Sequence, residues 1–515
     1  MKEKRKVSCC KIQLGLGESM KTDGVLYERI YRLIRNQIEC GLLPCGSKLP
    51  SRASLCEDFQ VSEKTVRRVL ELLAKDGLIE TSQRKRPVVA RVNSSNEKKK
   101  NLHILVDRKT ANDLFQTGRL ICYPLVEQGI SLCTEADWRI PLAIIHAMDP
   151  ANSIEFWRLS NLLWRFFITR NGNDLAIRIV DSLGFSKIDP LPGSLETRET
   201  YLENIRKFVQ TASGGGDIRS VNFEDLSYLY GISGNRALER TLYRVMPDSP
   251  LRTGLNGLER RIRDTEERYS RVYMDLLGLI SIGRYQPGDR LPSHLELQKL
   301  YGVSVDTTNK AIRILRDWGV VTAKRGSGIY VAMDLSALKR AHIPEEMIAC
   351  HLRRFLDNMD LLCFTIDGVA AHAAGFVTAE EAEALQYAIR RHWDEEYIYQ
   401  TAPATLLEFI TEHIHHTVLK EIYKVILENY HIGRSIPKLV KKGKFTENIE
   451  IHQRVEEAVG CLAQGDPEGF SARSAELFRR IQQMIIAECK KLGYWEIAEQ
   501  VYDGAALWQE RNFSR

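Results

Sequence analysis

The sequence predicts a mainly α-helical protein in which two small modules, each built from three helices and a β-hairpin, alternate with two larger all-helical bundle domains. Three observations predict this class. A segment near the start of the chain is repeated in the middle, apolar residues elsewhere recur at helical spacing, and strand-like alternation is scarce. At 515 residues, the chain is long enough for three or four domains.

The repeat consists of matching residues at one constant offset of 242 positions. Residues 41–51 read GLLPCGSKLPS and residues 283–293 read GRYQPGDRLPS, so that two Gly, one Leu, one Pro and one Ser coincide. The match continues downstream, where Val61-Ser62, Thr65 and Gly77-Leu78-Ile79 correspond to Val303-Ser304, Thr307 and Gly319-Val320-Val321. Several spacings that agree together indicate a duplicated structural unit.

Each copy predicts the same order of elements. In the first copy, residues 26–40 form an amphipathic helix that Gly41 ends, Ser51 caps a second helix, and Ser62 caps a third. The third helix combines a buried stripe with a polar face that points outward. The stripe is Val66, Val69, Leu70 and Leu73, and the polar face is Glu63, Lys64, Thr65, Arg67 and Arg68. Residues 78–79 and 88–89 then predict the two strands of a hairpin.

Three helices followed by a hairpin are the winged helix-turn-helix arrangement, whose third helix lies in the major groove of DNA. Both copies resemble the DNA-binding domain of the GntR family, whose pattern is G-x-x-x-x-G-x-x-L-P-S, then V-S-x-x-T, then a glycine-rich wing. The resemblance implies a bacterial transcription regulator that binds double-stranded DNA. The residues expected to contact DNA are Ser51, Arg52, Ser62, Lys64, Thr65, Arg67, Arg68, Arg84, Lys85 and Arg86 in the first copy, and Ser293, Ser304, Thr307, Thr308, Lys310, Lys324, Arg325 and Gly326 in the second.

The copies depart from the family at positions where it commonly carries arginine. The residue three places after the proline is Ala53 or Leu295, and the residue after the Val-Ser pair is Glu63 or Val305. A third family arginine is kept as Arg67 but is Asn309 in the second copy. Only the second copy has a family-like wing, at residues 324–328. We therefore expect two unequal modules, of which the first binds DNA more tightly.

The charge of the chain is unevenly distributed, although the formal net charge is only +6. Residues 1–100 carry 22 Lys and Arg against 12 Asp and Glu, residues 269–332 carry 9 against 5, and the remainder is acidic. Two basic blocks fit two modules that face phosphates. The alternative interpretation is two solvated surfaces.

The stretches that follow the modules predict helices. After the second module, apolar residues have helical spacing over residues 347–364, 379–393, 405–430, 447–464 and 467–492. This half resembles the FCD type of GntR regulator, an all-helical bundle around a small-molecule pocket, most closely at residues 450–459 and Gly465-Asp466. Residues 156–175 resemble the same type more distantly. The resemblance implies a whole unit duplicated in tandem and a small-molecule effector.

Many FCD bundles bind a divalent metal through one carboxylate and three histidines. Here Glu412 and His416 have the spacing that places both on one helix face, and His452 matches a histidine of the next helix, but the last helix has none. The alternative is a polar helix face in solvent. We therefore predict no cofactor, with a divalent metal at Glu412, His416 and His452 as the alternative.

Other features narrow the class of protein. No apolar run is long enough for a membrane helix, no signal peptide is evident, and the 11 cysteines are scattered, so we expect a cytoplasmic protein with reduced thiols and no membrane partner. There is no phosphate-binding loop, Gly-x-Ser-x-Gly elbow or His-Glu-x-x-His motif, so we do not expect an enzyme.

The predicted function is a DNA-binding transcription regulator that responds to a small-molecule effector in a helical domain. The alternative is an architectural or protein-interaction factor whose helical domains only dimerise. An enclosed polar pocket in a helical domain would favour the regulator, and solid apolar packing would favour the architectural factor. The chain acts either as a single-chain pseudo-dimer or as a homodimer. The predicted domains are a basic tail (1–25), the first winged domain (26–92), a degenerate FCD-like domain (101–255), the second winged domain (265–332) and a second FCD-like domain (336–505).

Overall fold

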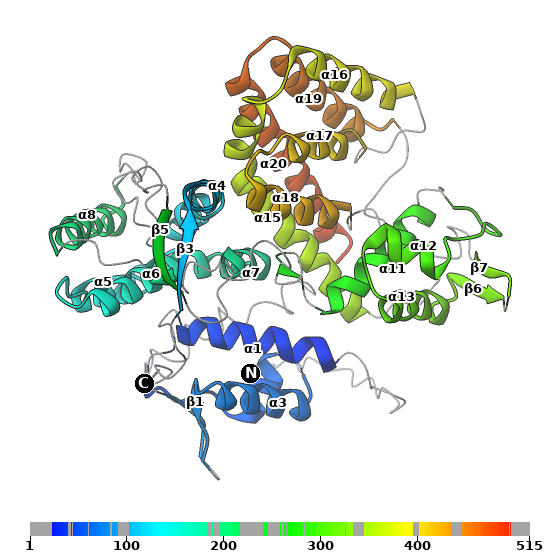
Figure 1. The fold of residues 1–515 in the computed structure, drawn as a ribbon. Helices are drawn as coiled ribbons and strands as arrows, with labels where there is room; N and C mark the ends of the chain where they lie inside the picture. The colour runs from blue at the N-terminus through cyan, green and yellow to red at the C-terminus, as the bar shows by residue number, and fades with distance from the viewer. Residues whose placement is uncertain are drawn as a thin grey trace, which may run out of the picture.

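The computed structural model shows four consecutive parts of the chain (Figure 1). We call them the first winged module (residues 23–90), the first helical body (102–245), the second winged module (265–332) and the second helical body (345–495). The structure describes residues 23–39, 43, 45–59, 61–82, 85–90, 102–183, 188–189, 195–216, 240–245, 258, 262–263, 265–281, 285–324, 326–332, 345–394, 401–431, 433, 444–493 and 495.

The two winged modules have the same fold, as the repeat predicts. The first contains α1 (Asp23–Glu39), α2 (Arg52–Asp58), α3 (Glu63–Lys75), β1 (Ile79–Glu80) and β2 (Val88–Val89). The second contains α11 (Thr265–Ser281), α12 (His294–Tyr301), α13 (Val305–Asp317), β6 (Val321–Lys324) and β7 (Gly328–Val331). The hairpins even share their register, because Ile79 pairs with Val89 and Val321 pairs with Val331, each 242 positions later.

Local sequence determines which face of the third helix is buried and where the helix ends. Its predicted apolar stripe is buried in the first module, which confirms the periodicity. Directly after the helix the chain turns through Gly77 (φ +71°) in the first module and Gly319 (φ +73°) in the second. This left-handed conformation favours glycine, so the two glycines are placed where the helix must end.

The first helical body combines helices with a small sheet. It contains β3 (Leu102–Asp107), α4 (Arg108–Ser131), α5 (Arg139–Ala147), α6 (Ser153–Arg170), α7 (Asp174–Leu183), β4 (Ile188–Asp189), α8 (Leu195–Ser213) and β5 (Arg240–Val245). The strands form an antiparallel sheet in the order β3-β5-β4, with Leu102 and Ile188 both opposite Val245. The expectation of an all-helical domain here is therefore wrong, because the sheet joins segments that lie far apart in the sequence.

The second helical body is helical throughout its described residues. It contains α15 (Glu345–Ala374), α16 (Ala379–Asp394), α17 (Thr401–Glu412), α18 (Thr417–Tyr430), α19 (Thr446–Ala463) and α20 (Pro467–Lys491). Helices α15 and α20 pack along each other, and α19 lies between α20 and α16. The predicted single helix over residues 405–430 is wrong, since the chain breaks there into α17 and α18. No described helix is both long and apolar enough to cross a membrane.

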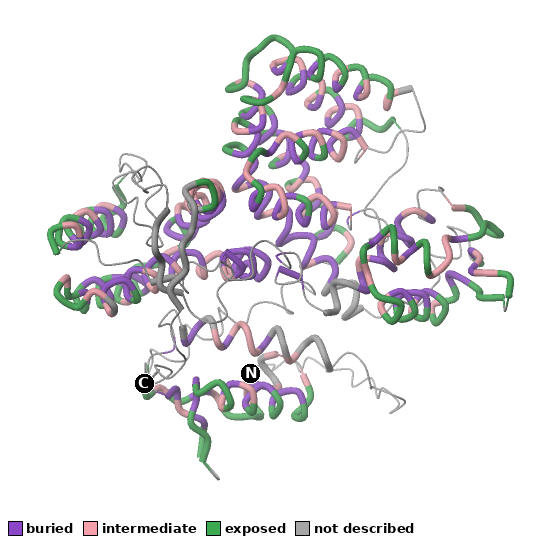
Figure 2. Tube along the Cα trace, in the orientation of Figure 1, coloured by how far each residue is buried: buried purple, intermediate pink, exposed green. Residues whose placement is uncertain are grey.

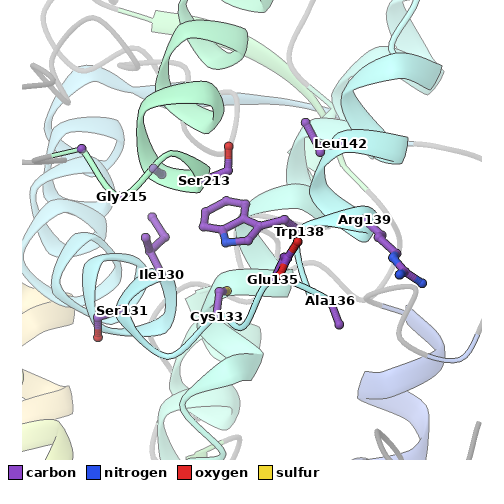
Figure 3. A pocket seen from close by; sticks show the side chains of 12 residues that line it. Ile130, Ser131, Cys133, Glu135, Ala136, Trp138, Arg139, Leu142, Ser213 and Gly215 are labelled. Carbon is purple, nitrogen blue, oxygen red and sulfur yellow. The ribbon is translucent and has the colours of Figure 1, made fainter. Parts of the chain in front are cut away.

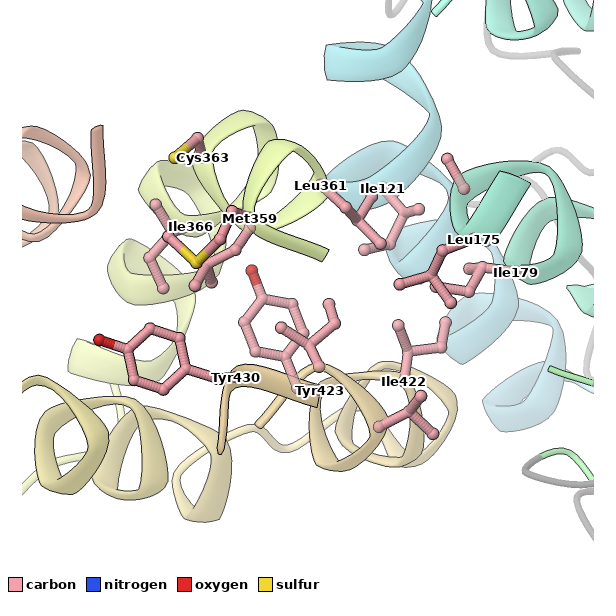
Figure 4. Close-up of a cluster of buried hydrophobic side chains, with 14 of the residues drawn as sticks. Ile121, Leu175, Ile179, Met359, Leu361, Cys363, Ile366, Ile422, Tyr423 and Tyr430 are labelled. Carbon is pink, nitrogen blue, oxygen red and sulfur yellow. The ribbon is translucent and has the colours of Figure 1, made fainter. Parts of the chain in front are cut away.

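The two helical bodies and the second winged module share one continuous apolar core, whereas the first winged module has a core of its own. The bodies meet where α4 and α7 pack on α15 and where α4 packs on α18. Figure 4 shows the side chains at this contact, where Ile121 and Leu175 approach Leu361 and Ile422. Buried residues run through the middle of the stacked helices, and exposed residues cover the outer sides (Figure 2).

Candidate nucleic-acid interface

The start of the third helix is built identically in the two modules. The Ser62 hydroxyl oxygen accepts a hydrogen bond from the backbone N–H of Thr65 at 3.2 Å, and Ser304 accepts one from Thr307 at 3.3 Å. In both copies the serine and threonine hydroxyls also lie 2.9 Å apart. Each serine therefore satisfies an N–H at the helix start, as predicted for a cap.

The outward face of α3 agrees with the prediction except at one residue. Glu63, Lys64, Arg67 and Arg68 are exposed, but only 2% of Thr65 is exposed. The prediction that Thr65 points outward is wrong, because its hydroxyl turns back to Ser62. Thr308 was likewise expected at DNA but is fully buried, and its hydroxyl contacts His294 Nδ1 at 3.1 Å and the Val305 carbonyl at 2.9 Å.

Two predicted DNA contacts are cations that pack against the first helix of their own module. The Arg68 guanidinium lies 4.0 Å from the Tyr27 ring centre and donates to its hydroxyl at 3.1 Å. The Lys310 ammonium lies 3.6 Å from the ring centre of Tyr269. Both members of the pair recur at the offset of 242, so the contact between first and third helix is duplicated. We therefore assign Arg68 and Lys310 to holding the third helix in place by a cation–π contact.

The remaining predicted residues fall into three groups. Ser51 and Ser293 cap the second helix through Ser54 and Glu296, and the Arg86 Nε donates to the Leu49 carbonyl at 2.7 Å, which ties the wing to the preceding loop. Arg84 and Arg325 lie outside the described residues. Exposed cations on the helices and the wings are Arg52, Lys64, Arg67, Lys85 and Lys324. The Lys324 ammonium lies 5.1 Å from the ring centre of Tyr330 in the same wing, and Gly326 lies in the turn of that wing.

The second module presents apolar side chains where the GntR resemblance expects arginine. Leu295 is 62% exposed near the start of α12, and Val305 is 49% exposed at the start of α13. The first module has Ala53 and Glu63 at the corresponding positions, both exposed, but retains Arg67 on α3. The first module therefore carries the more cationic helix face, in line with the expected inequality.

Comparison with known proteins agrees with this geometry. Residues 26–89 and 268–331 match the family described as bacterial regulatory proteins, gntR family. Both winged modules belong to the gntR family. Over 63 residues the chain is 46% identical to the uncharacterized HTH-type transcriptional regulator YdfD of Bacillus subtilis, a stretch that covers 12% of this chain and 13% of that protein.

Further relatives match longer stretches at lower identity. The histidine utilization repressor of Klebsiella aerogenes is 29% identical over 25% of this chain and 53% of its own length. The Uxu operon transcriptional regulator of Escherichia coli is 25% identical over 30% of this chain and 62% of its own length. The chain thus spans from about an eighth to about three fifths of these curated relatives. A solved structure, Streptococcus agalactiae GntR, aligns with 42% of this chain and 99% of its own at 18% identity and a TM-score of 0.19.

A hollow in the first helical body lies outside the two gntR modules. It has a volume of about 940 Å³ and lies between the end of α4, the start of α5 and the end of α8 (Figure 3). The Trp138 side chain lies among the residues that line the hollow, and Glu135 and Arg139 are exposed beside it. The adjoining loop is held by Asp137, which accepts hydrogen bonds from the N–H and the hydroxyl of Thr134 at 2.7 Å and pairs with Arg170 at 3.0 Å.

The predicted metal ligands are not brought together. Helix α17 ends at Glu412 and α18 begins at Thr417, so Glu412 and His416 do not share a helix face. The Glu412 carboxylate pairs with Lys420 at 3.0 Å, His416 stacks on His372 at 4.4 Å, and His452 lies 4.6 Å from the Trp393 ring. Burial, together with His416 and His415, lowers the pKa of His372 to about 4. Among the described residues, no three His, Cys, Asp or Glu side chains form a group that could hold a metal ion.

Proposed function

We propose that this protein is a DNA-binding transcription regulator whose first winged module makes the main sequence-specific contact. The observation that carries the proposal is the exposed cationic face of α3, on a module that belongs to the gntR family. Relatives named as a repressor, an activator and an operon regulator support it. A regulator of this kind would act in the cytoplasm, where bacterial DNA lies.

The proposed DNA contact follows from the placement of the exposed cations. With α3 in the major groove, its N-terminal half faces base edges, so Lys64 and Arg67 are the candidates for base recognition. Arg52 at the start of α2 and Lys85 in the wing flank this helix in the chain and would contact phosphates, which position the module without selecting a sequence. In the second module Asp306 and Asn309 replace the cations of α3, so its contact would depend on the wing residue Lys324.

Removal of Arg67 tests the proposal. We expect Arg67→Ala to weaken binding to a specific duplex by about 1–3 kcal/mol, because a bidentate base contact is lost. The fold should be unaffected, since the partner of Arg67 is Glu71 in an exposed ion pair of the kind that contributes little. The measurement is an anisotropy titration on a duplex selected from a random pool.

The matched control is Arg473→Ala, which removes an exposed arginine paired with Glu476 on α20. It should leave the affinity unchanged. Equal affinities of the wild type and Arg67→Ala, or no DNA binding even at low salt, would contradict the proposed function.

The effector part of the function is a second element of the same proposal. The hollow around Trp138 would take a small molecule with a flat apolar part against the indole and a polar group directed to Glu135 or Arg139. Pockets of about 300–1,000 Å³ with a few polar groups are typical of such ligands. The hollow is open at one edge, unlike the enclosed polar pocket expected of a sensing domain, so a ligand-binding measurement has to decide between the sensing regulator and the architectural alternative.

A thermal-shift screen of metabolites tests the hollow. A ligand present at a hundred times its Kd should stabilise the protein by about 2.7 kcal/mol. Ala136→Trp, which fills the hollow from its exposed edge, should abolish the shift, whereas Ala147→Trp on the exposed face of α5 should preserve it. A shift that survives in Ala136→Trp would place the effector elsewhere.

A further inference from the structure

The two winged modules are attached to the helical bodies in different ways. The second is part of the shared apolar core: Tyr273 on α11 lies edge-on to Trp318 and forms a 2.5 Å hydrogen bond with His351 on α15. The first has a separate apolar core. Its placement against the bodies therefore depends more strongly on polar contacts.

Among the described residues, one polar contact between the first module and the helical bodies is a carboxylate held by two arginines. Arg32 on α1 donates to Asp174 through Nε to Oδ1 and through Nη2 to Oδ2, both at 3.3 Å. Asp174 is the first residue of α7 and is only 3% exposed. Arg178, one helical turn later and 5% exposed, donates its Nε to the same carboxylate at 3.0 Å. A paired geometry of this kind fixes orientation as well as distance.

The start of α7 also contacts the other parts of the chain. Asn173 donates to the Asp357 carbonyl on α15 at 2.7 Å, and Arg178 donates to the carbonyl of Ile262. The next residue, Arg263, binds Glu428 on α18. Glu428 in turn accepts from Arg271 on α11 of the second module. A continuous series of polar contacts therefore leads from α1 of the first winged module to α11 of the second.

We propose that Asp174 is a positioning residue that sets the spacing between the two winged modules and thereby the spacing of the half-sites that the protein selects on DNA. The second module is held by the shared core and keeps its place. The first is held through Arg32, and replacement of Asp174 removes the carboxylate that both arginines share. The part that concerns DNA rests on the proposed function.

The effect on DNA follows from helical geometry. An insertion of about five base pairs, half a turn, between two half-sites moves one of them to the opposite side of the duplex. Two modules held at a fixed spacing can no longer engage both, so the gain from linked binding is lost. We expect the wild type to lose roughly 100-fold in affinity on such an insertion, and Asp174→Asn to lose about tenfold or less.

The test uses the full-length chain, with Asp181→Asn as a matched control. Asp181 lies on the same helix, but its partner Arg165 belongs to the same helical body. Anisotropy titrations on the selected duplex, with and without the insertion, measure the spacing dependence. Small-angle X-ray scattering without DNA measures the placement of the first module, and we expect a larger maximum dimension for Asp174→Asn only.

Scattering separates the two possible failures, because it does not depend on DNA binding. If the protein binds no DNA but Asp174→Asn is expanded, the proposed function fails and the positioning role of Asp174 stands. If Asp174→Asn matches the wild type and Asp181→Asn in scattering or in spacing dependence, the inference is overturned. If Asp174→Asn does not fold, Arg32→Gln replaces it in the same measurements. This variant breaks the same contact from the side of the first module and leaves the Arg178–Asp174 contact in place.

Discussion

Raising the salt concentration from 50 to 200 mM should weaken DNA binding by roughly three orders of magnitude or more. The cause is the release of counterions from phosphates that Lys and Arg neutralise. Residues 1–100 carry 22 Lys and Arg against 12 Asp and Glu, and the exposed cations of the first winged module include Arg52, Lys64 and Lys85. If about six cations lie on phosphates, the logarithm of affinity falls with the logarithm of salt at a slope near −5.

Anisotropy titrations across this range measure the slope. Lys85→Ala should lower its magnitude by about 1 and weaken binding almost equally for all sequences, as expected for a phosphate contact. Lys207→Ala on α8 removes an exposed lysine from an i,i+4 ion pair and serves as the control. An affinity that does not change between 50 and 200 mM would show that phosphate contacts do not drive the interaction.

The winged modules could be predicted from sequence because their determinants are local. Ser62 and Ser304 cap helices through residues three positions away, and Gly77 supplies the left-handed turn that ends α3. The apolar stripe of α3 follows from helical periodicity alone. None of these features depends on a distant part of the chain. The serine cap and the glycine after the third helix occur in both copies of the module.

Periodicity did not show where the polar side chains of the third helix go. It placed Arg68 on the outward face, where Arg68 is exposed, but it did not show that Arg68 and Lys310 each lie over a tyrosine ring of the first helix. The side chain of an arginine or lysine is long enough to choose between solvent and a neighbouring ring. The repetition of Tyr27 as Tyr269 at the offset of 242 was the signal that could have found this contact.

The helix that follows the break between the predicted metal ligands is capped by a residue of another domain. Ile410, Ile414 and Val418 keep helical spacing across the break, so the apolar pattern alone gave no reason to end the helix. In the structure, Asp113 on α4 of the first helical body accepts hydrogen bonds from the N–H groups of Thr417 and Val418 at 2.9 and 3.3 Å. A distant carboxylate thus caps α18 and fixes its start.

The sheet of the first helical body was missed for a similar reason. Residues 102–107 form a short run that pairs with residues 240–245, more than 130 positions later. A run of six residues with apolar and polar positions is too short to identify a strand when its partner is unknown. The pairing of residues 102–107 with residues 240–245 is established only when the body folds, so it leaves no local signal in either segment.

A single chain is expected to occupy one minimal operator with two unlike half-sites. Ordinary winged regulators with one DNA-binding domain per chain place two domains on DNA by forming a dimer. Here one chain holds two gntR modules, and its two helical bodies already pack on each other through α4, α7, α15 and α18. The contact is both apolar, as at Ile121 and Leu361 (Figure 4), and polar, as at Asp113. We therefore propose that this internal contact takes the place of a dimer interface.

Light scattering on the protein–DNA complex measures the stoichiometry. The expected protein mass is that of one chain, 58.9 kDa, on the shortest duplex that retains full affinity. Because no association between chains is needed, binding curves should follow a single-site isotherm and should not steepen with protein concentration. The half-sites should differ, since α3 presents Lys64 and Arg67 where α13 presents Asp306 and Asn309. Two chains on that duplex, with four modules and a longer protected site, would contradict the pseudo-dimer. The surfaces that join the two chains would then lie outside the contact between the two helical bodies of one chain.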